Sequence, residues 1–539
     1  MGRAIHILFT QMAVSSSLTF LLLLALFSGC QTKRSSERVP YLEKPNIILI
    51  YADDLGIGLL GHEGQQIITT PHIDRLAEEG IRFENAYSSM LCAPARASLL
   101  TGRHDCHSDG FEITAAGIYK KIGTGEMSHS QVESLISEYL KEVPDKQMFL
   151  GQLAKEAGYT TGQYGKLEWG FAATQGQMRR HGWDHYFGYL DHVRAHGFYP
   201  PYLFGNRGLK EISGNTRSDC GKSSEPEGEA NFRERWNMEG KQSYSQEIFM
   251  DSVLAFLGAH RDQPFFLYFP TQLPHGPVAV PEVHPDFVYD KRLTQIEKEY
   301  ASMVKMLDDH VGQIIRELQK LGIDDNTMVI FTSDNGHEIY YAQEGRVQKP
   351  YRNMETGELF DNLERKYYSK AAGDVFDGNG GRAGLKRSNL EGGLQVPLII
   401  RWPGRIAPGS VCRRLVSAYD FLPTLADICG TRVDFDTDGL SFYNELIGEK
   451  SQKEHENLVF SSFYGPTLIS RDGWKLRTYL DQEVFELYCL SDDFREEWDL
   501  ARDYPEKLFE MKKELLEACD GDFSNGYFSN AKNLIRVHL

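Results

Sequence analysis

Short apolar runs alternate with amphipathic stretches from residue 45 to about residue 430. The run NIILIY at 46–51 predicts a buried strand, and PHIDRLAEEG at 71–80 predicts a helix with Thr70 as its cap. An amphipathic stretch followed by an apolar run recurs three times, which predicts helix and then strand at 149–157 and 159–165, at 244–257 and 264–269, and at 294–321 and 327–332. This succession predicts a parallel sheet covered by helices on both faces.

The pattern closes with an apolar run at 396–400 and a predicted helix at 420–428, and it changes beyond about residue 450. There, an antiparallel sheet and a final helix are predicted at 458–463, 466–470, 474–479, 484–490 and 505–518. We expect an α/β fold with a large, mixed but mostly parallel sheet between helices at 45–450, and a smaller antiparallel sheet plus helix at 451–539. Polar stretches at 105–148, 207–242 and 339–383 predict loops that shape a binding site.

Residues 1–29 have the pattern of a secretory signal peptide. The apolar run at 18–27 is shorter than the roughly 20 residues of a membrane-spanning helix, and small residues separate it from Cys30. The segment FSGC at 27–30 resembles the lipobox of bacterial lipoproteins, which implies that Cys30 is acylated and that residues 30–44 are a tether. We expect export in a Gram-negative-type bacterium, to the periplasm or the outer membrane, with membrane contact only through the lipid at Cys30. Ordinary secretion is one alternative, and a short buried helix with an ordinary cysteine is the other.

The charge balance bears on possible partners. The 539 residues include 58 Lys and Arg against 76 Asp and Glu, a net charge of −18, which disfavours binding to nucleic acid. An anionic substrate would therefore have to be held by a local cluster of cations. The eight cysteines contain no CxxC pair, so a zinc ribbon and a thioredoxin motif are excluded.

Acidic residues follow two of the predicted strands. Asp53 and Asp54 come directly after NIILIYA, and Asp334 and Asn335 come directly after TMVIFTS. Both pairs are expected at the carboxyl edge of the sheet, where open α/β sheets place ligands. Three carboxylates and an amide oxygen are suited to Ca²⁺, with Mg²⁺ as the alternative, and are poor ligands for zinc. Taken singly, each pair could instead form a turn or a helix cap.

The segment LCAPARASLLTGR at 91–103 is the most specific motif of the chain. Cys92, Pro94 and Arg96 form Cys-x-Pro-x-Arg, and Leu-x-Thr-Gly-Arg follows. This segment resembles the motif of type I sulfatases, a family with an alkaline-phosphatase-like fold. The resemblance implies that a separate maturation enzyme oxidises Cys92 to formylglycine. A buried or redox-active cysteine is the alternative reading.

Further motifs follow in the order found in that family. They are Gly165-Lys166, PHGP at 274–277, SDNG at 333–336, GLK at 384–386 and RDGWKL at 471–476. The likeness spans residue 45 to about residue 510 and is broken at the three polar stretches. It implies that Lys166, His275 and Lys386 join Arg96 around the cysteine. Taken alone, each would be read as a surface charge or a loop histidine.

The chemistry of a sulfate ester requires these residue types together. Displacement at sulfur moves negative charge onto the ester oxygen, so a metal and fixed cations must hold the tetrahedral anion in line. The resemblance implies that one hydroxyl of hydrated formylglycine coordinates the metal and attacks sulfur, and that the other expels sulfate by re-forming the aldehyde. It also implies that Lys386 or His275 lies near the leaving oxygen. Arg96 and Lys166 would then order the diol and the sulfate.

One position departs from the family pattern. The family often has a histidine two residues after the lysine of the Gly-Lys motif, and GKLEWG places Glu168 there. That histidine helps to deprotonate the second hydroxyl, so its loss leaves two readings. Glu168 could accept the proton as an ionised carboxylate, or it could cap or orient Lys166 while another base acts.

The segment at 186–203 bears on the substrate. It resembles a stretch of a bacterial arylsulfatase A-like branch that includes carbohydrate sulfatases, which implies a sulfated saccharide, with galactose or N-acetylgalactosamine sulfate as the expected sugar. His196 is the candidate for substrate contact, and a loop histidine bonded to backbone is the alternative. His104 and His107, which follow the cysteine motif, are expected to line the same opening.

Two other functions stay open. A phosphoester or phosphonate ester hydrolase of the same superfamily could use the same metal and cations, and turnover of matched aryl sulfates and phosphates would separate it from a sulfatase. A non-catalytic glycan-binding lipoprotein is compatible with the change at Glu168. An intact thiol at Cys92 after expression with a maturation enzyme, without sulfate release, would favour that third possibility.

Overall fold

A computed structural model of the chain describes residues 44–109, 117–139, 147–169, 174–224, 228–342, 346–360, 363–432 and 434–527. The predicted signal peptide at 1–29, the acylation site at Cys30 and nearly all of the predicted tether lie outside these residues. Within the described ranges, none of the helices has both the length and the apolar character that crossing a bilayer requires.

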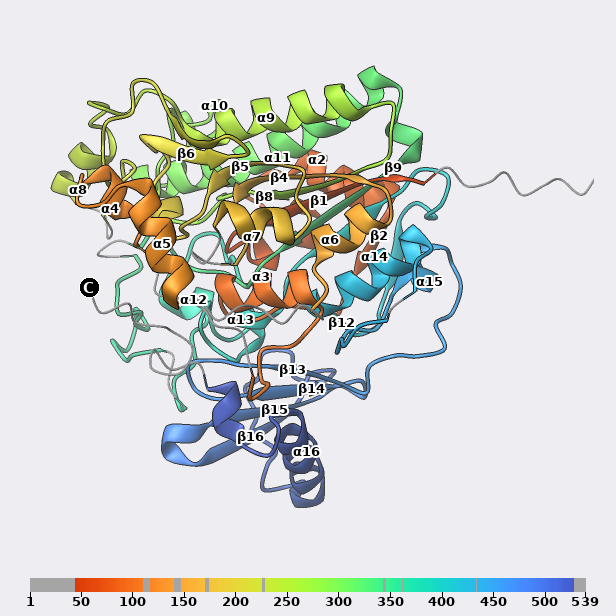
Figure 1. Cartoon of the computed structure of the whole chain (residues 1–539). Coiled ribbons are helices and arrows are strands. Elements are labelled where there is room, and N and C mark those ends of the chain that lie inside the picture. The colour runs from red at the N-terminus through yellow and green to blue at the C-terminus, as the bar shows by residue number, and fades with distance from the viewer. Residues whose placement is uncertain are drawn as a thin grey trace, which may run out of the picture. The chain divides into compact units, whose positions relative to one another are not determined.

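A ten-stranded sheet forms the main part of the structure (Figure 1). Its five central strands are parallel to one another and lie in the order β9 (Thr327–Ser333), β1 (Asn46–Ala52), β8 (Phe265–Pro270), β4 (Thr160–Lys166) and β5 (His185–Tyr189). The flanking strands are β10 (Leu398–Arg401), β2 (Ile81–Phe83) and β11 (Ser410–Cys412) on one side, and β6 (Tyr202–Gly205) and β7 (Gly208–Glu211) on the other. Because β10 and β6 are antiparallel to their inner neighbours, the sheet is mixed, which confirms the predicted fold class.

Helices cover both faces of the sheet, as the alternation along β1 requires. Ile47 and Leu49 pack into one hydrophobic core and Ile48 and Ile50 into the other. Figure 1 shows the first face covered by α3 (Cys92–Thr101), α6 (Leu150–Glu156) and α14 (Phe421–Cys429), and the second by α9 (Ser245–His260) and α11 (Gln295–Leu321). The second core also includes α2 (Pro71–Glu79).

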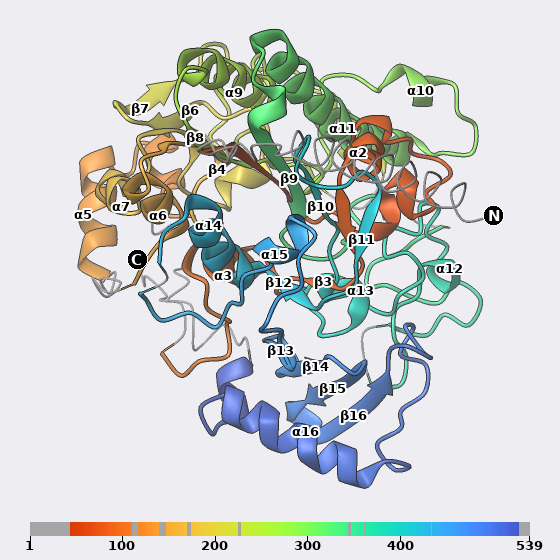
Figure 2. The same cartoon turned by 90° about the vertical axis from the view of Figure 1, so that its right-hand side faces the viewer.

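The C-terminal segment forms a separate antiparallel sheet, seen in Figure 2 with one helix beside it. Its strands are β13 (Asn457–Phe460), β14 (Thr467–Ser470), β15 (Trp474–Tyr479) and β16 (Val484–Cys489), and the helix is α16 (Pro505–Ala518). Leu476 and Leu487 of the sheet and Met511 and Leu515 of the helix are buried in one small core. The predicted antiparallel sheet with a helix is therefore present, and the predicted domain boundary at 450 stays a prediction.

The three polar stretches predicted as loops contain short elements in their described parts. These elements are α4 (Lys120–Gly123), α5 (His129–Tyr139), β7, α8 (Glu229–Arg235) and α12 (Ser369–Ala372). In the described part of the first stretch, Tyr119, Val132 and Ile136 anchor the chain, because they are buried in the same core as Ile47. The remaining short elements are β3 (Ala86–Tyr87), β12 (Val416–Ser417), α7 (Gln175–Arg180), α10 (Pro285–Val288), α13 (Glu391–Leu394) and α15 (Tyr443–Leu446).

Candidate active site

The two acidic pairs lie together at one edge of the large sheet. β1 and β9 are parallel and in register, with Ala52 opposite Ser333, so the residues that follow each strand emerge side by side. The backbone N–H of Asp54 donates to Asp334 Oδ1 at 3.0 Å, and Asn335 Nδ2 donates to Asp54 Oδ1 at 2.7 Å. All four side chains, including that of Asp53, are buried.

Three cations reach these carboxylates from three other parts of the chain. Lys166, at the end of β4, donates to Asp53 Oδ2 at 2.6 Å. Arg96, one helical turn after Cys92 on α3, donates to Asp334 Oδ2 at 2.7 Å and lies 3.5 Å from Asp53 Oδ1. Lys386 Nζ donates to Asp54 Oδ2 at 2.7 Å. The predicted cations therefore gather around the predicted acids.

Cys92 is the first residue of α3 and is only 9% exposed. Burial alone would lower the pKa of Lys386, but the negative charges of Asp54 and of a Cys92 thiolate raise it above its ordinary value. Asp334 and Asp53 contribute most to raising the pKa of Arg96, and Cys92 also contributes. The sulfur therefore lies within electrostatic range of two cations that hold the acidic pairs.

Two histidines complete the cluster. His275 Nε2 is 3.4 Å from Asp54 Oδ2 and 3.3 Å from Lys386 Nζ, and the His196 ring stacks on the His275 ring with 4.4 Å between centroids. Burial holds the pKa of His275 well below its ordinary value. The negative charge of Asp54 raises this pKa, and the positive charge of Lys386 lowers it further. Burial and the charges of His275 and Lys166 also hold the pKa of His196 well below its ordinary value. Both rings are therefore neutral near pH 7.

The acidic edge has the features of a cation site. Asp53 Oδ1 and Asn335 Oδ1 are buried without a hydrogen-bond partner, which is costly unless another group contacts them. Burial and the negative charge of Asp53 raise the pKa of Asp334 to about 7, although Arg96 opposes this. A hard divalent cation would offset the repulsion between these carboxylates and would bind the unpartnered oxygens. The residues therefore fit Ca²⁺ or Mg²⁺.

Glu168 does not contact Lys166, as one of the two sequence-based readings requires, and the reading of Glu168 as a base stays a prediction. Its backbone has a left-handed φ of 57°, and its carboxylate accepts from Trp183 Nε1 at 2.7 Å and lies 2.6 Å from His181 Nδ1. Within the described ranges, no hydrogen bond or ion pair joins Glu168 to Lys166. Both of its oxygens are thus engaged by residues 13 and 15 positions later in the chain.

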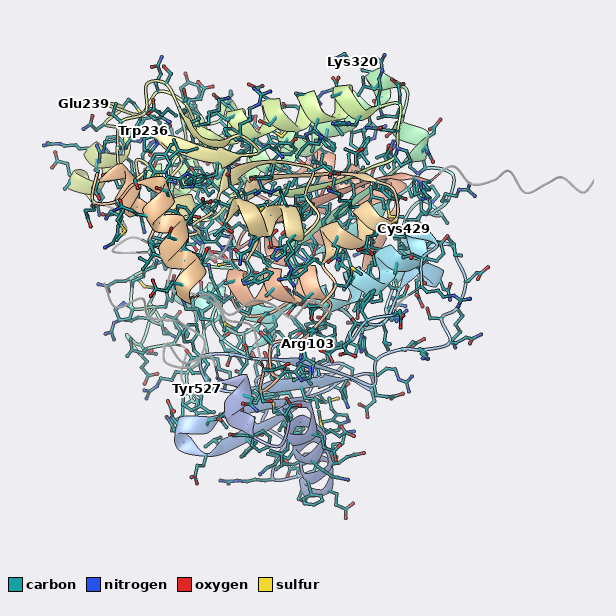
Figure 3. All side chains as sticks on the ribbon, in the orientation of Figure 1. Arg103, Trp236, Glu239, Lys320, Cys429 and Tyr527 are labelled. Carbon is teal, nitrogen blue, oxygen red and sulfur yellow. The ribbon has the colours of Figure 1, made fainter. Side chains whose placement is uncertain are left out.

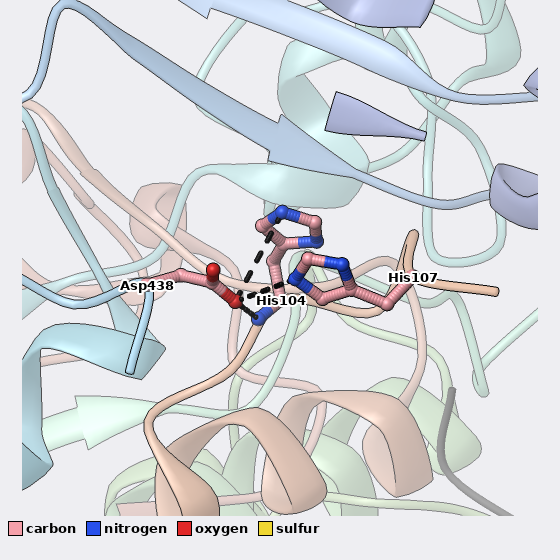
Figure 4. A group of neighbouring side chains, drawn as sticks. All are labelled: His104, His107 and Asp438. Carbon is pink, nitrogen blue, oxygen red and sulfur yellow. Dashed lines mark hydrogen bonds and ion pairs between the residues drawn. The ribbon is translucent and has the colours of Figure 1, made fainter. Parts of the chain in front are cut away.

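His104 forms a cluster of its own, shown in Figure 4 with His107 and Asp438. The two imidazole rings are stacked with 3.9 Å between centroids, and His107 Nε2 is 3.0 Å from Asp438 Oδ2. The backbone N–H of His104 donates to the same oxygen at 2.9 Å, and its ring Nδ1 accepts from the Cys106 N–H at 3.3 Å. Figure 3 labels Arg103 where the chain leaves α3 to enter this loop. The substrate contact expected of His104 stays a prediction.

Two residues near the site were not identified from the sequence. The Tyr340 hydroxyl donates to the carboxylate of Asp54, and Lys386 Nζ lies 3.5 Å from that hydroxyl. The His192 ring lies within electrostatic range of Lys166 and Arg96. Tyr340 follows Asn335 without any motif that marks it. His192 is four residues before His196, in a segment that the sequence had already indicated.

Comparisons with known proteins agree with this geometry. A family model described as Sulfatase matches residues 45–431, and one described as N-sulphoglucosamine sulphohydrolase, C-terminal, matches residues 384–520. The chain is 28% identical over 557 residues to the N-acetylgalactosamine-6-O-sulfatase of Bacteroides thetaiotaomicron, covering 94% of this chain and 99% of that protein. It is 30% identical over 420 residues to the N-acetylgalactosamine-6-sulfatase of Rattus norvegicus, covering 75% of this chain and 66% of that protein.

The fold also has solved counterparts. A Bacteroides thetaiotaomicron protein solved in work on glycosaminoglycan metabolism has a TM-score of 0.64 and 24% identity to the chain, covering 89% of this chain and 100% of that one. At this identity the likeness concerns the fold, and it extends over both the large and the small sheet.

Proposed function

The chain belongs to the sulfatase family, as its cysteine motif predicts, and from this premise we propose that it removes sulfate from a saccharide with residue 92, converted to formylglycine, as the nucleophile. One observation carries the proposal. Arg96, on the same helix as Cys92, contacts both Asp334 and Asp53, while Lys386 contacts Asp54 and is in electrostatic range of Cys92. The nucleophile position, the acidic edge and the cations thus form one site.

The charge of the site suits an anionic ester. The buried carboxylates and the buried permanent cations are equal in number: Asp53, Asp54 and Asp334 against Arg96, Lys166 and Lys386. A divalent cation on the free oxygens of Asp53 and Asn335 would therefore leave a net positive charge, which a sulfate ester offsets. When bound, the ion would polarise the sulfate group as a Lewis acid. We propose Ca²⁺, with Mg²⁺ as the alternative.

The residues of the chain would have the following roles in hydrolysis of the sulfate ester. A hydroxyl oxygen of the hydrated formylglycine would give up its proton and form a bond to sulfur, while the bond from sulfur to the sugar oxygen breaks and that oxygen takes up a proton. Lys386, charged and 3.3 Å from His275, is placed to give its proton or its charge to the leaving oxygen. Arg96 and Lys166 hold the carboxylates and the anion in line.

The substrate proposal draws on the relatives and on the expected export. The relatives are named for 6-sulfated N-acetylgalactosamine, so this sugar or a galactose sulfate is the proposed substrate, with His196 in contact with it. His196 stacks on His275 at the site, which supports this role. A maturation enzyme that acts on Cys92 would be the protein partner. We also propose that the protein is exported and anchored through a lipid at Cys30.

Sulfate release tests this proposal. The full chain is expressed with a sulfatase-maturating enzyme, and sulfate released from N-acetylgalactosamine 6-sulfate and from 4-nitrophenyl sulfate is measured by ion chromatography. We expect turnover that falls on the order of 10⁶-fold in Cys92→Ala, as for loss of other covalent nucleophiles, with the melting temperature retained. Faster turnover of 4-nitrophenyl phosphate would favour the phosphoester hydrolase. Saccharide binding without turnover of any ester would favour the glycan-binding lipoprotein.

A further inference from the structure

His192 is a buried histidine that the roles above leave without a task. It lies between β5 and the short turn at Arg194–His196, and its side chain is 5% exposed. Its Nε2 is 3.2 Å from the carbonyl oxygen of Leu167, the residue between Lys166 and Glu168. The ring thus contacts the backbone directly after the Gly-Lys motif, between Lys166 and Glu168.

The state of the ring follows from its contacts. A carbonyl oxygen only accepts, so Nε2 carries the proton and Nδ1 carries a lone pair if the ring is neutral. Burial, followed by the charges of Lys166 and Arg96 and then of His196, holds the pKa of His192 well below its ordinary value, so the ring is neutral. Nδ1 is buried and has no hydrogen-bond partner. The free acceptor nitrogen belongs to a ring that contacts Leu167, the residue after the active-site cation Lys166, and it is available to take a proton.

The other candidate for this task is already engaged. Both carboxylate oxygens of Glu168 face His181 and Trp183, and its left-handed backbone directs it to them. His181 is in turn stacked on Phe149, with 3.8 Å between ring centroids. Glu168 therefore has a structural role in this aromatic cluster, and a separate base is required.

We propose that His192 is the base that accepts the proton of the second formylglycine hydroxyl when sulfate leaves the enzyme. In this step the bond between the formylglycine carbon and the sulfate oxygen breaks, and both of its electrons leave with sulfate. The electrons of the second O–H bond form the aldehyde C=O, and the proton goes to His192 Nδ1. Water then adds to the aldehyde and restores the hydrate, and His192 returns its proton to solvent. His192 can act in this way only if the proposed function is correct.

The experiment separates the two chemical steps. His192→Ala and His192→Asn are made in the full chain with Cys92 converted, and the Asn variant keeps a donor for the Leu167 carbonyl. His310→Asn is the matched control, because His310 is also buried with an unpartnered Nδ1, and burial alone lowers its pKa to about 3. Each enzyme is mixed in separate reactions with 4-nitrophenyl sulfate and with N-acetylgalactosamine 6-sulfate. The reactions are quenched at intervals, and the mass of the intact protein is measured by mass spectrometry.

We expect the His192 variants to release one equivalent of 4-nitrophenol rapidly and then to turn over about 10²–10⁴-fold more slowly than the wild type. Their intact mass should increase by one SO₃ group, while the wild type and His310→Asn should not accumulate this species. A structural role for His192 would slow both steps and would leave no sulfated enzyme.

Other outcomes overturn the assignment. If the His192 variants lose the rapid release, or turn over without accumulating sulfated enzyme, His192 is not the base although the proposed function stands. If Glu168→Gln accumulates the sulfated enzyme in place of the His192 variants, Glu168 is the base. If the converted wild type hydrolyses neither ester, the proposed function itself fails.

Discussion

Two of the clusters of buried charge in the described residues differ in how closely cations approach their carboxylate oxygens. In the cluster that joins the two sheets, Lys475 of β15 is 2.9 Å from both Glu391 and Glu496, and the other oxygen of Glu391 accepts from the Tyr87 hydroxyl at 3.0 Å. In the cluster at the end of β1 and β9, Asp53 uses one oxygen for Lys166 and has no hydrogen-bond partner for the other.

The difference separates a structural ion pair from a binding site. Both clusters are made from fully buried acids and cations, so burial and charge alone do not identify function. A carboxylate such as Glu391, with both oxygens satisfied, can only hold the chain together. Asp53 Oδ1 has no hydrogen bond and lies 3.5 Å from Arg96, so the cluster at the end of β1 and β9 needs a further positive group. Glu496 Oε1 also lacks a hydrogen bond, but it lies 2.9 Å from Lys475 Nζ, so the cluster at Lys475 is closed by its own ion pairs.

The largest effect that separates the clusters is expected from Asp53→Asn. Loss of this carboxylate should weaken Ca²⁺ binding and lower turnover on the order of 10³-fold, because a Lewis acid contributes several kcal/mol to such reactions. Chelation of the wild-type enzyme should have the same effect and be reversed by added Ca²⁺ or Mg²⁺. Calorimetric titration with Ca²⁺ measures the binding. Glu391→Gln is the matched control, and equal loss of Ca²⁺ binding in both variants would contradict the distinction.

Lys475→Met should have a smaller effect, on stability alone. Removing this cation leaves Glu391 and Glu496 buried without their partner, so the free energy of unfolding should fall by about 3–5 kcal/mol. Urea unfolding measures this change, and turnover per folded molecule should remain that of the wild type. A loss of turnover at unchanged stability would mean that the joint between the sheets takes part in the reaction.

The smallest effect concerns the pH dependence of stability that comes from the ion pairs of His107 with Asp438 and Asp520. Burial alone would lower the pKa of His107, but the hydrogen bond and charge of Asp438 raise it above its ordinary value. His107 Nδ1 also lies 3.5 Å from Asp520, beyond α16. Protonated His107 therefore stabilises the folded state fully below the ordinary histidine pKa of about 6.5. This stabilisation is lost as pH rises through the raised pKa of His107.

Melting temperatures of the wild type and His107→Asn measure this effect across the same range of pH. The gap between them should close as pH rises, and it should correspond to at most about 1 kcal/mol because the pair is partly exposed. A gap that widens with pH would show that neutral His107 stabilises the joint.

The sequence predicts those features of the fold and the site that depend on neighbouring residues in the chain. The apolar runs that became β1 and β9 end at the acids that now meet, because parallel strands bring their carboxyl ends to one edge. The helix predicted at 294–321 is α11 at Gln295–Leu321, since its capping box at Thr294 and Glu297 marks its start. The cysteine motif identified the position from which Arg96 reaches the acids.

Contacts between distant segments explain what could not be predicted. The antiparallel pairing of β10 with β2 joins residues more than 300 positions apart, and no local pattern encodes it. The direction of Glu168 depends on a left-handed backbone and on His181 and Trp183. His192 lies in the segment at 186–203, which predicts substrate contact, but its place beside Leu167 depends on the pairing of β4 with β5.

The most direct test compares the fraction of residue 92 converted to formylglycine with the rate of sulfate release. Preparations made with different amounts of maturation enzyme are assayed on N-acetylgalactosamine 6-sulfate and 4-nitrophenyl sulfate, and the peptide that carries residue 92 is quantified by mass spectrometry. The rate per total protein should rise in proportion to the aldehyde-bearing fraction and vanish at zero conversion. Equal sulfate release from preparations that retain the Cys92 thiol, or none from fully converted enzyme, would contradict the account.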